Sequence, residues 1–247
     1  MSDVPEFNSP RVQFFDSAQS VETYYGNLPH WRQPDVAYFV TWRLADSLPQ
    51  TVLDRWVRRK SSWLNCHGID PSWQRDDPDR FRLAYASIPR ADRSQFERDQ
   101  RRILFAELNQ GAGSCILRFQ WLRRIVSDAM WFFHGKRVWL GDYVIMPNHV
   151  HAILIPFTHY ALEDLIGSIK KWSARRIRKA LRSMEEREKR LYHSRPRLWQ
   201  RETYDHIIRD PNELQRCRNY IEENPRRARL HRDEYEYWRA AWLDNVW

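Results

Sequence analysis

Two histidines separated by one valine, His149 and His151, have the types and spacing that could do chemistry. They follow a Met-Pro-Asn turn and open an apolar run, which predicts a strand over 149–156. Alternate residues of a strand point to the same side, so both imidazoles are expected on one face, opposite Val150. Such a pair either binds one divalent ion together with oxygen ligands, or consists of hydrogen-bonded core or surface histidines. With no cysteine nearby, a metal site here would be open, which suits catalysis better than structure.

A second pair, Tyr220 and Asn224, stands four residues apart in a predicted helix. Asp210 is a good N-cap residue, Pro211 fits the first helical position, and Glu213 can complete a capping box. The helix is expected to seat on the apolar stripe of Leu214, Cys217 and Ile221, and Pro225 is expected to end or distort it.

The spacing of four puts Tyr220 and Asn224 on one side of that helix, about 6 Å apart along its axis. A tyrosine hydroxyl beside a metal-held phosphate can act as a nucleophile and form a covalent phosphotyrosine. Asn224 offers an amide oxygen, a ligand suited to Mg²⁺ or Mn²⁺. Alternatively, Tyr220 is a half-buried aromatic residue and Asn224 a helix terminator before proline.

The elements that must position these residues follow from apolar periodicity. A strand is predicted over 36–44, whose alternate residues from Val36 to Leu44 share one face. Two further strands, over 137–146 and 149–156, are predicted to form an antiparallel hairpin. A short strand is expected at 205–209. Helices are expected over about 49–64, 94–109, 117–136, 161–182 with a continuation to Arg190, and from 211; residues 67–80 are expected to form a loop.

This order predicts an α+β fold in which helices pack on an antiparallel sheet. Residues 1–30 are expected to form an extended arm, and residues 31–247 a single domain with a helical insertion at about 47–115. No apolar stretch reaches the roughly 18 residues of a membrane span. The N-terminus lacks the layout of a signal peptide, and three distant cysteines indicate neither a disulfide framework nor a structural zinc site, so a cytoplasmic location is expected.

Composition indicates a polyanionic partner. The net charge is +9, and six of the 41 basic residues are lysine, which leaves 35 arginines. Guanidinium groups bind phosphate in a bidentate manner, and thirteen tryptophans and eleven tyrosines offer stacking surfaces for unpaired bases. A genome rich in G and C would give the same arginine excess without any nucleic-acid function.

Four segments in this order, YVIMPNHVHAIL, SIKKWSARRIRKAL, LWQRETYDHIIRD and NYIEENPRRARL, resemble the REP-associated tyrosine transposases, relatives of the single-tyrosine HUH transposases of bacterial insertion sequences. The resemblance covers about residues 36–45 and 117–232. It implies a ferredoxin-like fold, with the His-hydrophobe-His strand at 149–151. It also implies Tyr220 as the nucleophile, Asn224 as the third metal ligand and Mg²⁺ or Mn²⁺ as cofactor.

The activity implied by this resemblance is cleavage and rejoining of single-stranded DNA at palindromic hairpins, through a tyrosine linked to the 5′ phosphate. It also implies a nucleoid-associated protein and leaves monomer and dimer open. A domesticated relative that binds hairpins without cutting them, and a metallohydrolase that uses activated water, remain alternatives. Tyr204 is a rival nucleophile, and the sequence does not decide whether Asp205 and His206 lie near the site.

The DNA is expected to contact the basic helix 165–182, whose isoleucines and Leu181 form the packing side. Its cations are Lys170, Lys171, Arg175, Arg176, Arg178, Lys179 and Arg182. Further expected contacts are Trp199, Arg201, Arg226, Arg227 and Arg229.

Overall fold

A computed structural model describes residues 12–16, 18–19, 22–25, 29–182 and 197–245. The chain divides into two compact units. The first combines Met1–Ala45 with Ser114–Trp247, and the second is Asp46–Gly113, where the sequence predicted a helical insertion.

A five-stranded sheet forms the first unit, and every neighbouring pair in it is antiparallel. The order is β6-β3-β5-β4-β7, and the strands are β3 (Tyr38–Arg43), β4 (Val138–Ile145), β5 (His149–Pro156), β6 (Tyr204–Ile207) and β7 (Glu236–Trp238). Helix α5 (Gln120–Trp131) lies between β3 and β4 in the chain, and α6 (Leu162–Arg182) between β5 and β6. This βαββαβ connectivity with the first strand in the interior is the ferredoxin-like arrangement that the resemblance implied. β7, which the sequence analysis did not predict, extends the sheet beyond β4.

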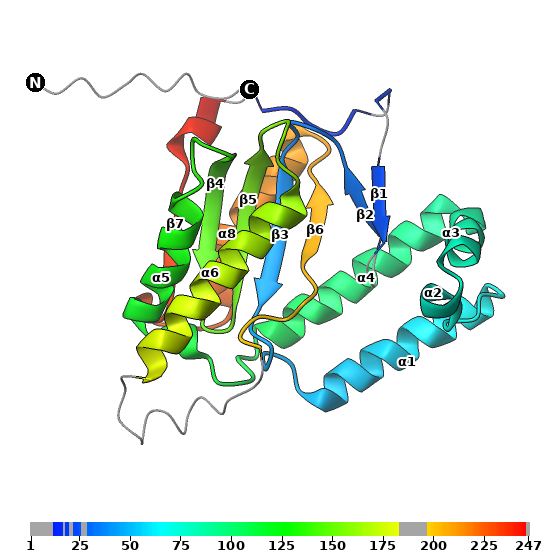
Figure 1. Cartoon of the computed structure of the whole chain (residues 1–247), viewed down its shortest axis with the longest axis horizontal. Coiled ribbons are helices and arrows are strands. Elements are labelled where there is room, and N and C mark those ends of the chain that lie inside the picture. The colour runs from blue at the N-terminus through cyan, green and yellow to red at the C-terminus, as the bar shows by residue number, and fades with distance from the viewer. Residues whose placement is uncertain (1–11, 17, 20–21, 26–28, 183–196, 246–247) are drawn as a thin grey trace, which may run out of the picture. The chain divides into compact units, whose positions relative to one another are not determined.

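The two faces of the sheet carry different helices, as Figure 1 shows, with α5 and α6 in front of the strands and α8 (Pro211–Arg227) behind them. On the front face, alternate residues of β3 and β5 enter one apolar core with α5 and α6. Trp42, Val150 and Leu154 are fully buried in this core, as the predicted alternation requires. Burial of each such side chain stabilises the folded state by about 1.5–3 kcal/mol. Because a shift of one residue would turn these side chains to the other face, their burial fixes the register of the strands.

One helix of this unit has bounds that differ from the predicted ones, and the bounds of another agree as far as the structure describes it. The helix predicted over 117–136 is a 3-10 turn at Ile116–Arg118 followed by α5, which stops at Trp131. α6 matches its predicted range to Arg182, and the expected continuation to Arg190 lies outside the described residues.

Pro225 was expected to end or distort the last predicted helix, and it does not end it. The proline is buried inside the helix, which continues to Arg227 and ends as the Ala228 N–H donates to the carbonyl of Asn224. Proline lacks an N–H and so removes one hydrogen bond of the helix. Because Pro225 lies close to the C-terminal end of α8, the remaining hydrogen bonds are sufficient to continue the helix for about half a turn.

The second unit is helical and has its own apolar cluster of Leu64, Ile69, Phe81, Tyr85 and Ile88. Its helices are α1 (Gln50–Cys66), α2 (Trp73–Asp76), α3 (Pro78–Ser87) and α4 (Arg90–Leu108). The loop predicted at 67–80 is wrong in its second half, which contains α2 and the start of α3. The Asp77 side chain accepts a hydrogen bond from the Arg80 N–H, and Pro78 occupies the first position, so this pair begins a helix.

The expected extended arm contains a hairpin of β1 (Glu22–Tyr25) and β2 (Pro29–Arg32), paired as Thr23 with Trp31 and Tyr24 with His30. Threonine and aromatic residues favour strands, which explains the correction. Residues 1–11 lie outside the described residues. No helix in the described part of the chain is both long and apolar enough to cross a bilayer.

Candidate active site

His149 and His151 lie on the back face of β5, the face that α8 covers. Their cross-strand partners on β3 are Arg43 and Thr41, while Val150 between them enters the front core. Both histidines are fully buried, with exposed fractions of 1% and 0%. The structure therefore confirms that the two imidazoles share one face.

The two rings meet through their Nε2 atoms, which are 3.0 Å apart. Nδ1 of His149 lies 2.6 Å from the amide oxygen of Asn148, and Nδ1 of His151 lies 2.7 Å from the hydroxyl of Thr41. Because the Asn148 oxygen only accepts, Nδ1 of His149 carries the proton and its Nε2 presents a lone pair. Outer hydrogen bonds of this kind fix the orientation of metal-binding histidines.

Both histidines are held in the neutral form that ligates metals. Burial, together with the charge of Arg43, lowers the pKa of His149 to about 3. Burial and the neighbouring His149 lower the pKa of His151 well below its usual value. At neutral pH, neither ring therefore carries the second proton that would make it a cation and repel a metal ion.

Helix α8 brings Tyr220 to the histidine pair. The Tyr220 ring lies 5.1 Å from the ring of His151 and 5.9 Å from that of Phe39, measured between centroids. Phe39 also stacks on His151 at 5.5 Å. Sequence reasoning placed Tyr220 on the flank of the helix, and the structure shows that this flank meets the histidine strand.

The start of α8 follows its predicted signals at Asp210 and Pro211, whereas Glu213 bonds to the residue before the N-cap and does not complete the predicted capping box. The Asp210 carboxylate accepts a hydrogen bond from the Glu213 N–H at 2.7 Å, and the Glu213 carboxylate accepts one from the Arg209 N–H at 2.9 Å. Leu214, Cys217 and Ile221 are buried, as predicted. These contacts fix where the helix begins and which side of it faces the sheet.

Asn224, one turn beyond Tyr220, is fully buried within α8 and does not terminate it. Neither its Nδ2 nor its Oδ1 has a hydrogen-bond partner among the described residues. A buried polar atom without a partner costs about 1–3 kcal/mol, so this amide oxygen is suited to a ligand that the chain does not itself supply. The described residues contain no cluster of three His, Cys, Asp or Glu side chains, so a third protein ligand must be of another type. A divalent ion fits two neutral imidazoles and an orphaned amide oxygen.

Tyr204, the rival nucleophile, lies on β6 and pairs with Thr41, which puts it on the same face. Its hydroxyl lies 3.2 Å from Nδ1 of His206, and Nε2 of His206 lies 3.4 Å from the Glu213 carboxylate. His206 also contacts the Phe39 ring at 5.5 Å. Tyr204 and His206 thus border the site, whereas the contact with His151 is made by Tyr220.

Asp205 points to the opposite face from His206. Its carboxylate accepts hydrogen bonds from Arg32 at 2.6 and 3.4 Å, and Arg32 also pairs with Glu163 at 2.6 Å. These contacts tie the N-terminal hairpin to the front of the sheet and place Asp205 away from the histidines.

The basic helix α6 has the predicted packing side, and Ile166, Ile169, Ile177 and Leu181 are buried in the front core. Its cations therefore lie across the sheet from the histidines. Five of them are exposed and one, Arg178, is half-buried: Lys171, Arg175, Arg176, Arg178, Lys179 and Arg182.

Lys170 of α6 is partly buried and bonds to the chain itself. Its ammonium donates to the carbonyl of Arg201 at 3.0 Å and to the Thr203 hydroxyl at 2.9 Å, and burial lowers its pKa to about 8. Lys170 thus anchors the segment that leads into β6.

Trp199 is buried in the front core, and its indole N–H donates to the Ser173 hydroxyl at 3.0 Å. The expectation that Trp199 contacts DNA is therefore wrong, because its ring is not available for stacking. Arg201, Arg226, Arg227 and Arg229 are exposed, as a contact surface requires. Arg227 also pairs with Glu223 at 2.6 Å and lies 5.6 Å from the Tyr220 ring.

Arg43 is a site residue that sequence reasoning missed. It pairs with His149 across the sheet and is 7% exposed. Burial lowers the pKa of Arg43 to about 10, although the nearby charge of Glu202 raises it in part. Its position alternates with the core residues of β3, a signal that becomes informative only once the register with β5 is known.

Parts of this chain are similar to known proteins. Residues 129–224 match the family described as IS200-like transposases, a range that begins in α5 and ends at Asn224. An uncharacterized protein of Haemophilus influenzae is 30% identical over 112 residues, covering 38% of this chain; the chain spans 57% of the length of that relative. A solved structure of a REP-associated tyrosine transposase bound to a REP hairpin aligns over 80% of this chain and 73% of that one, with 14% identity and a TM-score of 0.35.

The family match covers β4, β5, α6, β6 and α8 up to the proposed third ligand. It thus includes both histidines, Tyr220 and Asn224 in one continuous segment. Over residues 129–224, the chain is therefore similar to the IS200-like transposases.

Proposed function

We propose that this protein is a metal-dependent endonuclease and strand transferase for single-stranded DNA, which acts through Tyr220. The observation that carries the proposal is the contact of the Tyr220 ring with His151, whose Nε2 faces that of His149. A nucleophile is thereby held beside two neutral nitrogens suited to a cation.

His149, His151 and Asn224 would hold Mg²⁺ or Mn²⁺. The ion, when bound, supplies Lewis-acid polarisation of the scissile phosphate and offsets its developing charge. A second observation that supports the proposal is Asn224, whose buried amide oxygen lacks a partner among the described residues.

Tyr220 supplies the attacking oxygen. Its hydroxyl gives up a proton and its oxygen bonds to phosphorus, while the bond from phosphorus to the 3′ oxygen breaks. The 3′ oxygen takes up a proton, which balances the one lost from Tyr220. The product is a 5′-phosphotyrosine and a free 3′ hydroxyl. Attack by a 3′ hydroxyl on the same phosphorus reverses the step and rejoins a strand, so the energy of the phosphodiester is conserved.

Arg43 favours a phosphate at this face because it is a buried guanidinium beside His149. The exposed cations of α6 would contact the phosphate backbone from the other side of the sheet, and the exposed Arg226 and Arg227 from the end of α8. A DNA substrate would therefore have to pass around an edge of the sheet to engage both surfaces.

The palindromic hairpin as substrate rests on the resemblance of the four sequence segments to REP-associated transposases. A domesticated protein that only binds such hairpins is the second candidate, favoured by the fact that the basic helix and the histidines lie on opposite faces. These two functions differ in whether a bound strand is cut.

The test is incubation of a single strand carrying an imperfect palindrome with the full chain and Mg²⁺ or Mn²⁺. We expect a denaturant-resistant protein–DNA adduct that is absent without the ion and absent in Tyr220→Phe, but present in Tyr204→Phe. Binding without cleavage would support the domesticated protein. Cleavage without any adduct, retained in Tyr220→Phe, would indicate a hydrolase that uses water.

A further inference from the structure

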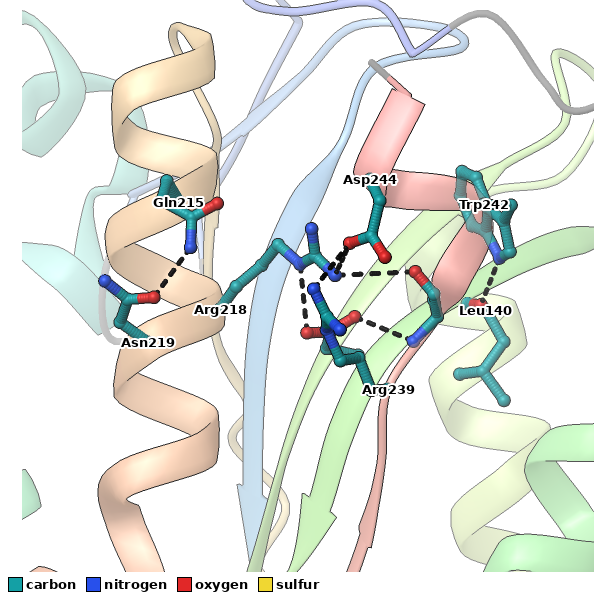
Figure 2. A network of polar contacts seen from close by, with 9 residues as sticks. Leu140, Gln215, Arg218, Asn219, Arg239, Trp242 and Asp244 are labelled. Carbon is teal, nitrogen blue, oxygen red and sulfur yellow. Dashed lines mark hydrogen bonds and ion pairs between the residues drawn. The ribbon is translucent and has the colours of Figure 1, made fainter. Parts of the chain in front are cut away.

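A buried ionic network ties α8 to the C-terminal segment, and it centres on Arg218 (Figure 2). The Arg218 side chain is 5% exposed. Its Nε donates to Asp142 Oδ2 at 3.0 Å, and its Nη2 donates to Asp244 Oδ1 at 2.7 Å. One guanidinium thereby joins a strand, a helix and the 3-10 turn Ala241–Asn245.

Asp142 uses both carboxylate oxygens in this network. While Oδ2 accepts from Arg218, Oδ1 accepts from the backbone N–H of Ala240 at 2.9 Å. The carbonyl of Ala240 lies 3.5 Å from Nη2 of Arg218, which closes a ring of contacts. The side chain is almost fully buried, so its charge depends on this complete set of partners.

An irregularity of β4 creates the place for Asp142. The register with β5 shifts between Leu140 and Tyr143, so that Gly141 and Asp142 form a bulge. A Cβ atom at Gly141 would lie 2.9 Å from Ile153 and 3.0 Å from Leu243. The glycine therefore allows the C-terminal turn to approach the strand, and bulges of this kind re-aim side chains beside active sites.

Arg218 and Tyr220 lie on opposite flanks of the buried stripe of α8, because successive helical residues are about 100° apart. Fixing one flank therefore fixes the rotation of the helix about its axis. A side chain ends at least about 5–6 Å from that axis, so a rotation of roughly 10° moves it by about 1 Å. An error of 1 Å can slow a reaction by about 100-fold.

The rest of the stripe cannot set this rotation as sharply. Leu214 and Ile221 are buried apolar side chains, and apolar contacts are not directional. A buried ionic network is often no more stabilising than apolar residues of the same volume, but its hydrogen bonds specify one geometry.

We propose that Arg218, Asp142 and Asp244 are positioning residues that hold the Tyr220 flank of α8 against the histidine pair, and that the C-terminal segment Glu236–Asn245 is the part of the chain that locks them. This inference rests on the proposed function of Tyr220. It predicts that loosening the network slows the chemical step without weakening DNA binding.

The test compares Asp244→Ala with Arg239→Ala in the full chain. Arg239 donates to the same oxygen of Asp244 at 2.9 Å, but it is exposed and does not join α8 to the sheet. Both variants thus lose an ion pair to one carboxylate, and only the first removes a partner of Arg218. Arg218→Lys is a third variant, which keeps the charge and loses the planar fork.

At a temperature well below unfolding, Asp244→Ala and Arg218→Lys should form the adduct about 10- to 100-fold more slowly at saturating DNA, with an unchanged Kd. Arg239→Ala should match the natural protein. Hydrogen exchange of amides 217–224 should be faster in Asp244→Ala than in Arg239→Ala. Equal adduct rates in all variants, with a lower melting temperature alone, would overturn the inference and leave the network a merely structural one.

Failure of the proposed function gives a different pattern. If the natural protein forms no adduct at all, that function is wrong, and hydrogen exchange still decides whether the network holds α8. Equal exchange of 217–224 in Asp244→Ala and Arg239→Ala would then reject the positioning role.

Discussion

Asn224 has an environment that conflicts with a purely structural role. Its side chain is fully buried, yet neither amide atom has a hydrogen-bond partner among the described residues. Replacement by Leu, which has a similar shape, should raise the free energy of unfolding of the metal-free protein by about 1–3 kcal/mol. The same change should abolish any rise in melting temperature on addition of Mn²⁺.

Denaturant unfolding with and without Mn²⁺ measures both effects. Asn219→Ala is the matched control, because Asn219 lies on the exposed side of the same helix and bonds only to Gln215 in the contacts of Figure 2. A loss of stability in metal-free Asn224→Leu would contradict the assignment of Asn224 as a ligand.

Glu213 predicts a pH dependence of stability. Burial raises its pKa, but the hydrogen bonds from His206 and the Arg209 N–H outweigh this effect and lower the pKa to about 2. A folded pKa below the unfolded value gives stability that is present above about pH 4.5 and lost as the pH falls toward 2. Glu213→Gln should therefore be about 1–3 kcal/mol less stable at pH 7, and the difference should shrink steadily below pH 4.5. Urea unfolding at pH 7, 4.5 and 3 checks this, and a difference independent of pH would contradict it.

Single residues were predictable from sequence where a local period determined their direction. The shared face of His149 and His151 follows from the strand alone, and the flank of Tyr220 follows from the helix alone. Their contact depends on how α8 packs on the sheet, which no local pattern contains. Trp199 was misassigned for the same reason, because only the fold shows that the indole is buried against α6.

At the scale of elements, apolar periodicity predicted β3, β5 and α6, and capping residues predicted the start of α8. β7 escaped prediction because it has three half-buried residues and exists only by pairing with β4. The network at Asp142 escaped because Arg218 is one of 35 arginines, and nothing local distinguishes a buried guanidinium from an exposed one. Both features depend on the C-terminal segment returning to the edge of the sheet.

Gly141 tests the bulge of β4 directly, and Gly167 in α6 is its control. Gly141→Ala puts a Cβ within 3.0 Å of Ile153 and Leu243 and should destabilise the fold by about 1–3 kcal/mol. Gly167→Ala has no neighbour within 4 Å and lies on an exposed position of α6, so it should stabilise the protein by about 1 kcal/mol. Chemical denaturation of the two variants measures both signs, and a neutral Gly141→Ala would show that the C-terminal turn does not pack closely on the bulge.

At the scale of the molecule, the exposed cations of α6 and the histidine pair lie on opposite faces of the sheet. α6 presents its exposed cations on the front, whereas Arg43 and the histidines lie at the back. Such a division predicts that affinity and catalysis can be changed separately. Phosphate contacts made by α6 would set the affinity, and the back face would set the rate.

Salt dependence measures the contribution of α6. Replacement of Lys171, Arg175 and Arg182 by Gln should weaken binding of a hairpin and reduce the slope of log K against log salt by about 2–3, since each lost phosphate contact removes about 0.7–0.9. The same number of exposed arginines replaced in the helical insertion, at Arg90, Arg98 and Arg102, is the control for net charge. An equal change of slope in both variants would contradict a specific role of α6.

The identity of the nucleophile is tested most directly by locating the DNA on the protein. The two candidate tyrosines lie on different tryptic peptides, Tyr220 within 219–226 and Tyr204 within 202–209. After the adduct is digested with nuclease and trypsin, mass spectrometry should find a nucleotide attached to peptide 219–226, at Tyr220. A nucleotide on peptide 202–209, or cleavage of the strand with neither peptide modified, would contradict the assignment of Tyr220 as the residue that attacks DNA.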